Sequence, residues 1–235
     1  MALSNLTKTP FSDTSGGLVT SFAFASVNVA AGKLITCVVK FEGTTAIDSI
    51  TDGGSNALAA AVNANDTPNG RAQQVSVWEK LVSSANATAV FTVTFTPANS
   101  AQFLVAELYV SDYAGTVVRT DQVGTVPNAS NTAIATASIN AGGAAFGGAS
   151  EFTGTTTTPG AGWTEDQDVA GAGGHMFSRY DTPGGTYTLN ATLATAAFWV
   201  AAVASYSEVG GALVEDGPEW YPMEPQTNPL TISVW

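Results

Sequence analysis

One histidine and a few strand-borne acids are the side chains of this sequence that could carry catalysis. The histidine, His175, follows a run of small residues at 170–174. A Ser-His-Asp triad would have to use it, because the triad needs an imidazole as its general base. Serines are plentiful, but none lies in a Gly-x-Ser-x-Gly turn. We therefore predict a structural histidine, in a loop or at the start of a strand, and a protein that is not an enzyme.

Paired carboxylates could instead support glycoside hydrolysis, in which one of them acts as the acid. Glu79, Glu107 and Glu151 lie in or near apparent strands, and Glu107 interrupts the apolar run Phe103–Tyr109. A buried carboxylate costs several kcal/mol unless it is paired. We therefore predict that Glu107 forms a structural ion pair rather than serving as a catalytic acid. The candidate cations are Arg71, Lys80, Arg119 and Arg179.

Metal-binding chemistry has one weak candidate, the oxygen-bearing side chains of Asp48, Asp52 and Asn56. Their spacing lacks the full ligand pattern of an EF-hand loop, so we favour a turn whose Asp and Asn side chains cap backbone amides. One cysteine, Cys37, and one histidine do not predict a transition-metal centre. Cys37 lies in an apolar stretch and is expected to be an inert core thiol. No phosphate-cradling motif occurs. Taken with the weak metal candidates, this leads us to predict no metal and no cofactor.

Tryptophans could build a platform on which sugar rings stack. Trp78, Trp163 and Trp199 are the candidates. Tryptophan in a β-sandwich is more often a core residue. We therefore expect these three side chains to pack inside the protein.

The composition argues against several classes of protein. The chain has 235 residues, 7 basic and 19 acidic, and a formal net charge of −12, whereas nucleic-acid binders need basic patches. A charged fraction of 11% beside 45% hydrophobic residues indicates a folded chain. No apolar run approaches the roughly 18–20 residues that span a bilayer, and the first residues lack the pattern of a secretory signal. We expect neither nucleic-acid nor membrane partners.

Alternating hydrophobicity predicts strands through most of the chain. Residues 74–81, 89–97 and 186–193 place apolar side chains at every second position. Three more uniformly apolar stretches predict central strands, buried on both faces or at an interface: residues 34–41, 102–110 and 197–206. The one helical expectation is a short turn at Asn56–Val62. Many strands with frequent turns predict an all-β fold, a jelly-roll-like β-sandwich with extended N- and C-terminal arms.

This pattern divides the chain into three regions. We predict an N-terminal arm or first edge strand over residues 1–17, the β-sandwich over 18–207 and an extended arm over 208–235. The last region holds four of the ten prolines and no Lys or Arg, and proline at this spacing excludes a helix interior. Leu230–Trp235 alternate and could add a strand to the sheet of a neighbouring subunit. The predicted partner-binding residues are Trp220, Tyr221, Met223, Leu230, Ile232 and Trp235.

Several motifs resemble a β-sandwich domain that recurs in tailed-phage structural proteins and in bacterial proteins. They are the turn Ile-Thr-Asp-Gly-Gly-Ser-Asn at 50–56, Val-Ser-Val-Trp-Glu-Lys at 75–80, Ala-Glu-Leu-Tyr-Val-Ser-Asp-Tyr-Ala-Gly at 106–115, and Thr-Pro-Gly-Gly-Thr-Tyr at 182–187 followed by Phe198–Val203. The resemblance covers roughly residues 18–207. The chain departs from the pattern in a longer Gly-containing turn and in an insertion within the Glu-Tyr-x-Gly stretch.

The resemblance implies a phage decoration (cement) protein that binds the outer surface of the capsid and stabilises contacts between capsomers. On this expectation the partners are the major capsid protein and other copies of the chain, as a homotrimer. The chain would be assembled in the host cytoplasm and would lie on the virion surface. The alternative is a carbohydrate-binding module of a phage tail or fibre protein, for which a glycan would be the partner.

Overall fold

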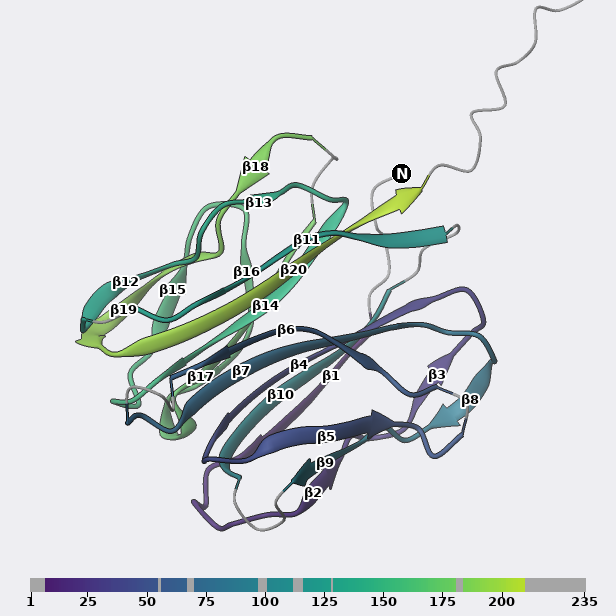
Figure 1. Ribbon diagram of the computed structural model, residues 1–235, viewed down its shortest axis with the longest axis horizontal. Coiled ribbons are helices and arrows are strands. Elements are labelled where there is room, and N and C mark those ends of the chain that lie inside the picture. Colours follow the sequence, from purple (N-terminus) through teal and green to yellow (C-terminus); the bar gives the residue numbers. More distant parts are fainter. Residues whose placement is uncertain are drawn as a thin grey trace, which may run out of the picture.

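The computed structural model describes residues 7–54, 56–66, 70–96, 101–111, 116–127, 129–180 and 184–209. Regular structure in these ranges is β-strand, apart from the single-turn 3-10 helix η2 (Ala170–Ala172). All strand pairs are antiparallel. The strands form two lobes that lie side by side in Figure 1, which we call the first half (residues 7–111) and the second half (residues 116–209).

The first half winds ten strands as one long folded hairpin. β1 pairs with β10, β2 with β9, β3 with β8 and β4 with β7. One layer is the sheet β1-β10-β4-β7-β6, and the other holds β2-β9-β5 and β3-β8, which is the order of a jelly roll. The strands are β1 (Thr7–Asp13), β2 (Ser21–Ala23), β3 (Val27–Val29), β4 (Leu34–Glu42), β5 (Ala46–Thr51), β6 (Ala59–Asn65), β7 (Gln73–Leu81), β8 (Asn86–Ala89), β9 (Thr92–Thr96) and β10 (Gln102–Ser111).

The second half repeats this order strand for strand. Its layers are β11-β20-β14-β17-β16 and, opposite, β12-β19-β15 with β13-β18, so each strand corresponds to the one ten places earlier. The jelly-roll-like prediction is thus confirmed, and the region predicted as a sandwich contains two of them. The strands are β11 (Thr116–Thr125), β12 (Asn131–Ala135), β13 (Ile139–Asn140), β14 (Ala144–Glu151), β15 (Thr157–Pro159), β16 (Thr164–Val169), β17 (Gly174–Tyr180), β18 (Thr186–Tyr187), β19 (Asn190–Ala197) and β20 (Trp199–Val209).

Three apolar clusters separate four layers of sheet. One lies within each half, and the third lies between the two five-stranded sheets, where Val38 and Val77 meet Phe146 and Ala202. Burying a side chain such as valine contributes roughly 1.5–3 kcal/mol, so this shared cluster ties the halves together. Together with the cluster inside each half, it buries both faces of β4 and β14. The prediction of doubly buried central strands over residues 34–41, 102–110 and 197–206 is confirmed.

Glycine lets the two large sheets approach closely. A Cβ at Gly148 would lie 2.9 Å from Val38 Cγ1, and one at Gly174 would lie 2.7 Å from Val105 Cβ, both across the boundary between the halves. Heavy atoms this close repel strongly, so a larger residue at either position would push the halves apart. Two of the glycines within residues 141–174 therefore have a packing cause at the boundary between the halves.

Two local predictions have different outcomes. Of the two expectations for residues 1–17, the first edge strand is confirmed for β1, and Pro10 is tolerated there because an edge strand has no ladder on its outer side. The helical turn expected at Asn56–Val62 is wrong, because β6 pairs with β7 over much of that stretch. Alanine favours helices, but tertiary pairing outweighs this intrinsic preference, which amounts to less than about 1 kcal/mol per residue. None of the described residues forms a helix that is long and apolar enough to cross a membrane.

Candidate functional site

Charged side chains gather around β16, an edge strand of the five-stranded sheet in the second half, which has the sequence Thr-Glu-Asp-Gln-Asp-Val. A β-bulge between Glu165 and Gln167 shifts its pairing with β17. A bulge re-aims the side chains that follow it. Asp166 and Gln167 therefore contact the first half, whereas Glu165 and Asp168 lie beside His175 on β17. The strand thus separates two polar clusters.

The Glu107 cluster comprises Lys8, Glu107, Tyr109, Asp166 and Gln167 and joins β1 and β10 to β16. Tyr109 Oη donates to Asp166 Oδ2 at 2.8 Å, and Lys8 forms an ion pair with Asp166. Gln167 Nε2 donates to Glu107 Oε2 at 2.7 Å. Burial raises the pKa of Glu107 to about 7, the hydrogen bond from Gln167 opposes this rise, and the charge of Asp166 adds to it.

The prediction that a cation pairs with Glu107 is wrong. Its hydrogen-bond partner among the described residues is the neutral amide of Gln167. Glu107 Oε1 has no hydrogen bond among the described residues. Partial protonation near neutral pH therefore replaces an ion pair as the way to reduce the cost of burial. The predicted cations lie elsewhere: Arg71 pairs with Asp66, and Arg119 pairs with Glu79.

The His175 cluster comprises Thr157, Glu165, Asp168 and His175. His175 is fully buried near the start of β17, so the predicted position at a strand start is confirmed. Its Nδ1 lies 3.2 Å from Thr157 Oγ1, 3.2 Å from Asp168 Oδ1 and 3.7 Å from Glu165 Oε1. Its Nε2 has no hydrogen-bond partner among the described residues and lies 3.9 Å from Glu151 Oε1.

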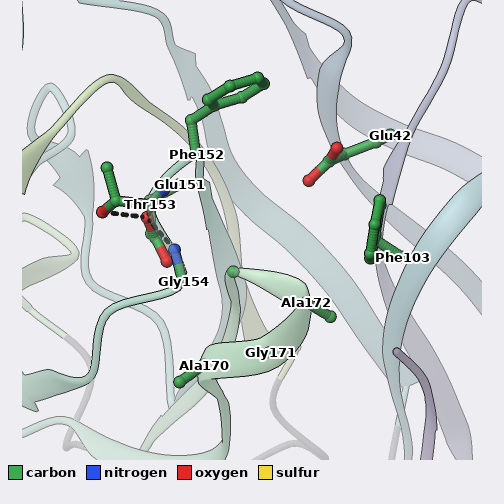
Figure 2. Close-up of a pocket in the computed structure, with 10 residues that line it drawn as sticks. Glu42, Phe103, Glu151, Phe152, Thr153, Gly154, Ala170, Gly171 and Ala172 are labelled. Atoms are coloured by element: carbon green, nitrogen blue, oxygen red, sulfur yellow. Dashed lines mark hydrogen bonds between the residues drawn. The ribbon is translucent and has the colours of Figure 1, made fainter. Parts of the chain in front are cut away.

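A pocket of about 490 Å³, the interhalf pocket, opens beside these clusters. Figure 2 shows Glu42 and Phe103 of the first half on one side and Phe152 and Thr153 of the second half on the other. Phe152 is 61% exposed, so an aromatic ring stands at the rim. The full lining is Glu42, Phe103, Glu151, Phe152, Thr153, Gly154, Ala170, Gly171, Ala172 and Gly173.

Buried charges hold the walls of the interhalf pocket. Lys40 Nζ donates to Glu42 Oε1 and to the carbonyl oxygen of Phe103, each at 3.0 Å, and to the carbonyl oxygen of Ala172 across the boundary. Burial lowers the pKa of Lys40, and the charge of Glu42 opposes this shift. Glu151 accepts backbone N–H groups of the loop that follows it, including Thr155 at 2.8 Å. These contacts fix the pocket without using its aromatic rim.

Phe103 has the backbone conformation that most needs an explanation. Its φ of 49° lies in the left-handed region, which bulky residues seldom adopt. The register of β10 with β4 shifts between Gln102 and Val105, and the carbonyl oxygen of Phe103 accepts a hydrogen bond from the Lys40 ammonium group. Local strain of this kind persists where surrounding contacts hold it in place, and it places the Phe103 ring in the pocket wall.

The remaining sequence candidates turn out to be structural. Asp52 caps its turn, since its carboxylate accepts N–H groups from Gly54, Asn56 and Asn86. Burial alone would raise the pKa of Asp52, but these hydrogen bonds outweigh burial and lower it. Cys37 is a buried free thiol, as predicted, and burial raises its pKa.

Trp78, Trp163 and Trp199, the three tryptophans among the described residues, do not form a platform. Trp163 and Trp199 are buried in the second-half core, as expected for core residues, whereas Trp78 packs partly buried against the first-half core. The six predicted partner-binding residues, Trp220, Tyr221, Met223, Leu230, Ile232 and Trp235, lie outside the described residues, as does most of the arm predicted over 208–235.

Sequence reasoning named Glu151 as a candidate carboxylate, but it missed the interhalf pocket that Glu151 lines and the positions of Glu165 and Asp168 beside His175. The acidic run Glu165–Asp168 was the available signal, because three acids within four residues are unusual in a strand. Glu42 and Phe152 carried no comparable signal, because each has an ordinary sequence context.

No family model matches the chain, and no curated protein and no solved structure is significantly similar to it. The structure supports the coarser part of the motif resemblance, an antiparallel β-sandwich protein with two similar halves.

Proposed function

We propose that this chain is a non-enzymatic virion protein of a tailed phage, a decoration (cement) protein that binds the outer surface of the capsid. The observation that carries the proposal is the apolar layer between the halves, which joins two jelly rolls into one block. Close-packed interiors of this kind resist deformation. A rigid block suits a protein that holds neighbouring capsomers together, and the motif resemblance supports the same role.

Sheet edges are the surfaces through which such a block would bind its partners. Within the described residues, β1 pairs with β10 alone and β6 with β7 alone, so each has an outer edge that could accept a strand. The alternating segment Leu230–Trp235 has the pattern of such a strand. The proposed partners are the major capsid protein and other copies of the chain, as a homotrimer on the virion surface, assembled in the host cytoplasm.

Co-sedimentation with empty capsids of the phage that encodes the chain tests this function, with light scattering for the oligomeric state. We expect the full chain to bind and to have the mass of a trimer. A chain truncated after Val209 should lose capsid binding, because it lacks the proposed contact residues. Leu18→Ala, which removes a 58% exposed side chain outside that region, should bind as the unchanged chain does.

Two outcomes would contradict the proposal, and each would overturn a different part of it. Failure of the full chain to bind capsids would overturn the decoration role. Full binding by the truncated chain would overturn only the assignment of Trp220, Tyr221, Met223, Leu230, Ile232 and Trp235 as contact residues.

The interhalf pocket favours a second candidate function, carbohydrate binding as a module of a tail or fibre protein. The exposed ring of Phe152 could stack on a sugar, and the Glu42 carboxylate could accept sugar hydroxyl groups. A glycan array with the full chain and with Phe152→Ala tests it. Binding that the variant loses would support this function, and an array on which the full chain binds no glycan would remove it.

A further inference from the structure

We propose that His175, Asp168 and Glu165 bind a divalent transition-metal ion, with zinc as the probe. The three side chains each offer one ligand atom, and these atoms lie within 4.8 Å of one another. An imidazole nitrogen with two carboxylates is a donor set that zinc accepts, and three protein ligands leave a fourth position open.

Two of the three distances between ligand atoms are close to those around a single bound ion. His175 Nδ1 lies 3.2 Å from Asp168 Oδ1 and 3.7 Å from Glu165 Oε1. Zinc binds such ligands at about 2.0–2.2 Å in a tetrahedron, so two of its ligands lie roughly 3.3–3.6 Å apart. Small side-chain adjustments would therefore bring all three atoms to bonding distance.

The bulge in β16 is the backbone feature that creates this arrangement. In a regular strand, residues three apart face opposite sides of the sheet. Here Asp168 lies opposite His175 and Glu165 lies opposite Phe177, because the pairing shifts between them. Both carboxylates therefore share the face of His175, while Asp166, the extra residue, contacts Lys8 and Tyr109 of the first half.

The groups around His175 Nδ1 are acceptors with no available hydrogen, so this nitrogen carries either a proton or a metal ion. Thr157 Oγ1 donates to Glu165, so its hydrogen is not available to Nδ1, and the carboxylates that face Nδ1 are acceptors only when ionised. A metal on Nδ1 would leave the ring hydrogen on Nε2, the buried atom without a partner, which faces Glu151. A carboxylate behind a metal-binding histidine is a common arrangement, because it fixes the tautomer.

Local charge and access agree with this assignment. Two lysines of the interface between the halves are engaged elsewhere, Lys8 with Asp166 and Lys40 with Glu42. The ion pairs of Glu165 and Asp168 involve His175 and no lysine or arginine among the described residues. The side chains of Glu165 and Asp168 are 16% and 24% exposed, so an ion can reach the cluster from solvent.

Calorimetric titration of the full chain with Zn²⁺ after chelator treatment tests the proposal, with Co²⁺ absorption as a second readout. We expect one ion per chain, and at least tenfold weaker binding in Asp168→Asn and in Glu165→Gln. Asp166→Asn is the matched control, because this carboxylate is also on β16 but contacts the first half, and it should bind zinc as the unchanged chain does. Circular dichroism of each variant confirms folding.

The single histidine of the sequence makes its imidazole directly observable by ¹⁵N NMR. Zinc should move the Nδ1 signal to the range of a metal-bound nitrogen and leave the hydrogen on Nε2. The proposal is overturned if the full chain shows no zinc binding, if Asp168→Asn binds equally well, or if His175 remains a doubly protonated imidazolium in the presence of zinc. The last result would mean that a proton, not a metal, balances the carboxylates.

Discussion

The two halves of the molecule wind ten strands in the same order but fill their cores with different side chains. The first half packs phenylalanines, with Phe22 and Phe24 ring centroids 5.4 Å apart and Phe22 and Phe95 centroids 6.2 Å apart. The second half uses alanines along β14 and β20 together with Trp163 and Trp199. The winding therefore depends on inward-facing apolar positions rather than on particular core residues.

A second contrast lies in the corresponding edge strands β6 and β16. Both carry a bulge against the neighbouring strand, between Ala60 and Val62 in one and between Glu165 and Gln167 in the other. In the first half the bulge presents alanine and valine to the cluster between the halves. In the second half it presents carboxylates. Topology thus decides where a candidate site lies, and a few side chains decide its chemistry.

Truncating one core residue in each half should have the largest effect, and it tests whether the two halves depend on their cores in the same way. Phe24 N donates to Phe91 O just outside β2 and β9, and Thr136 N donates to Leu189 O just outside β12 and β19, both at 3.0 Å, so the two pairs occupy corresponding places. Phe91→Ala should lower the free energy of unfolding by about 3–5 kcal/mol and Leu189→Ala by about 2–5 kcal/mol. Because the halves share an apolar layer, each variant should still unfold in one transition.

Urea denaturation followed by circular dichroism and tryptophan fluorescence measures both effects. Two separated transitions in either variant would contradict the view that the shared layer couples the halves.

Gly148→Val sharpens the comparison at the boundary itself. The new Cβ would lie 2.9 Å from Val38 Cγ1 of the first half, so the Val38 side chain or the sheets must shift. We expect a loss of about 1–3 kcal/mol in the free energy of unfolding, measured by denaturant titration. Gly171→Ala is the control, because its Cβ would meet Thr14 Cγ2 at an ordinary 3.6 Å. Equal stability of the two variants would count against close packing at Gly148.

Glu107→Gln should have the smallest effect, and this effect depends on pH. The folded pKa of about 7 lies above the ordinary value of 4.5, so protonation favours the folded state. The unchanged chain should therefore lose stability as pH rises from about 5 to 8. Relative to it, the variant should gain on the order of 1–2 kcal/mol over that range, since solvent screens part of the shift. Parallel stability curves for the two proteins would exclude a raised pKa.

Local patterns predicted much of the fold. Phe91, Val93 and Phe95 are buried as their alternation requires, and so are Tyr187, Leu189, Ala191 and Leu193. The failure at Asn56–Val62 has a physical reason, since the helix preference of alanine is small compared with the free energy of pairing with β7. The duplication was not predicted, because different side chains fill the equivalent strands of the two halves.

The candidate site was less predictable than the strands. The buried position of Glu107 followed from its apolar neighbours, but its partner Gln167 lies sixty residues away. His175 was placed correctly at a strand start, yet no pattern indicated that Glu151, Glu165 and Asp168 would surround it. Motifs record spacing along the chain, and these contacts join separate strands.

By itself, the sequence determined that the chain forms antiparallel strands around apolar cores, because alternation of side chains is a property of neighbouring residues. Only the tertiary structure decided that β1 pairs with β10, that two jelly rolls stack face to face, and that a bulge turns Glu165 and Asp168 toward His175. Those features depend on contacts between distant strands, where one shifted pairing reverses which face a side chain occupies.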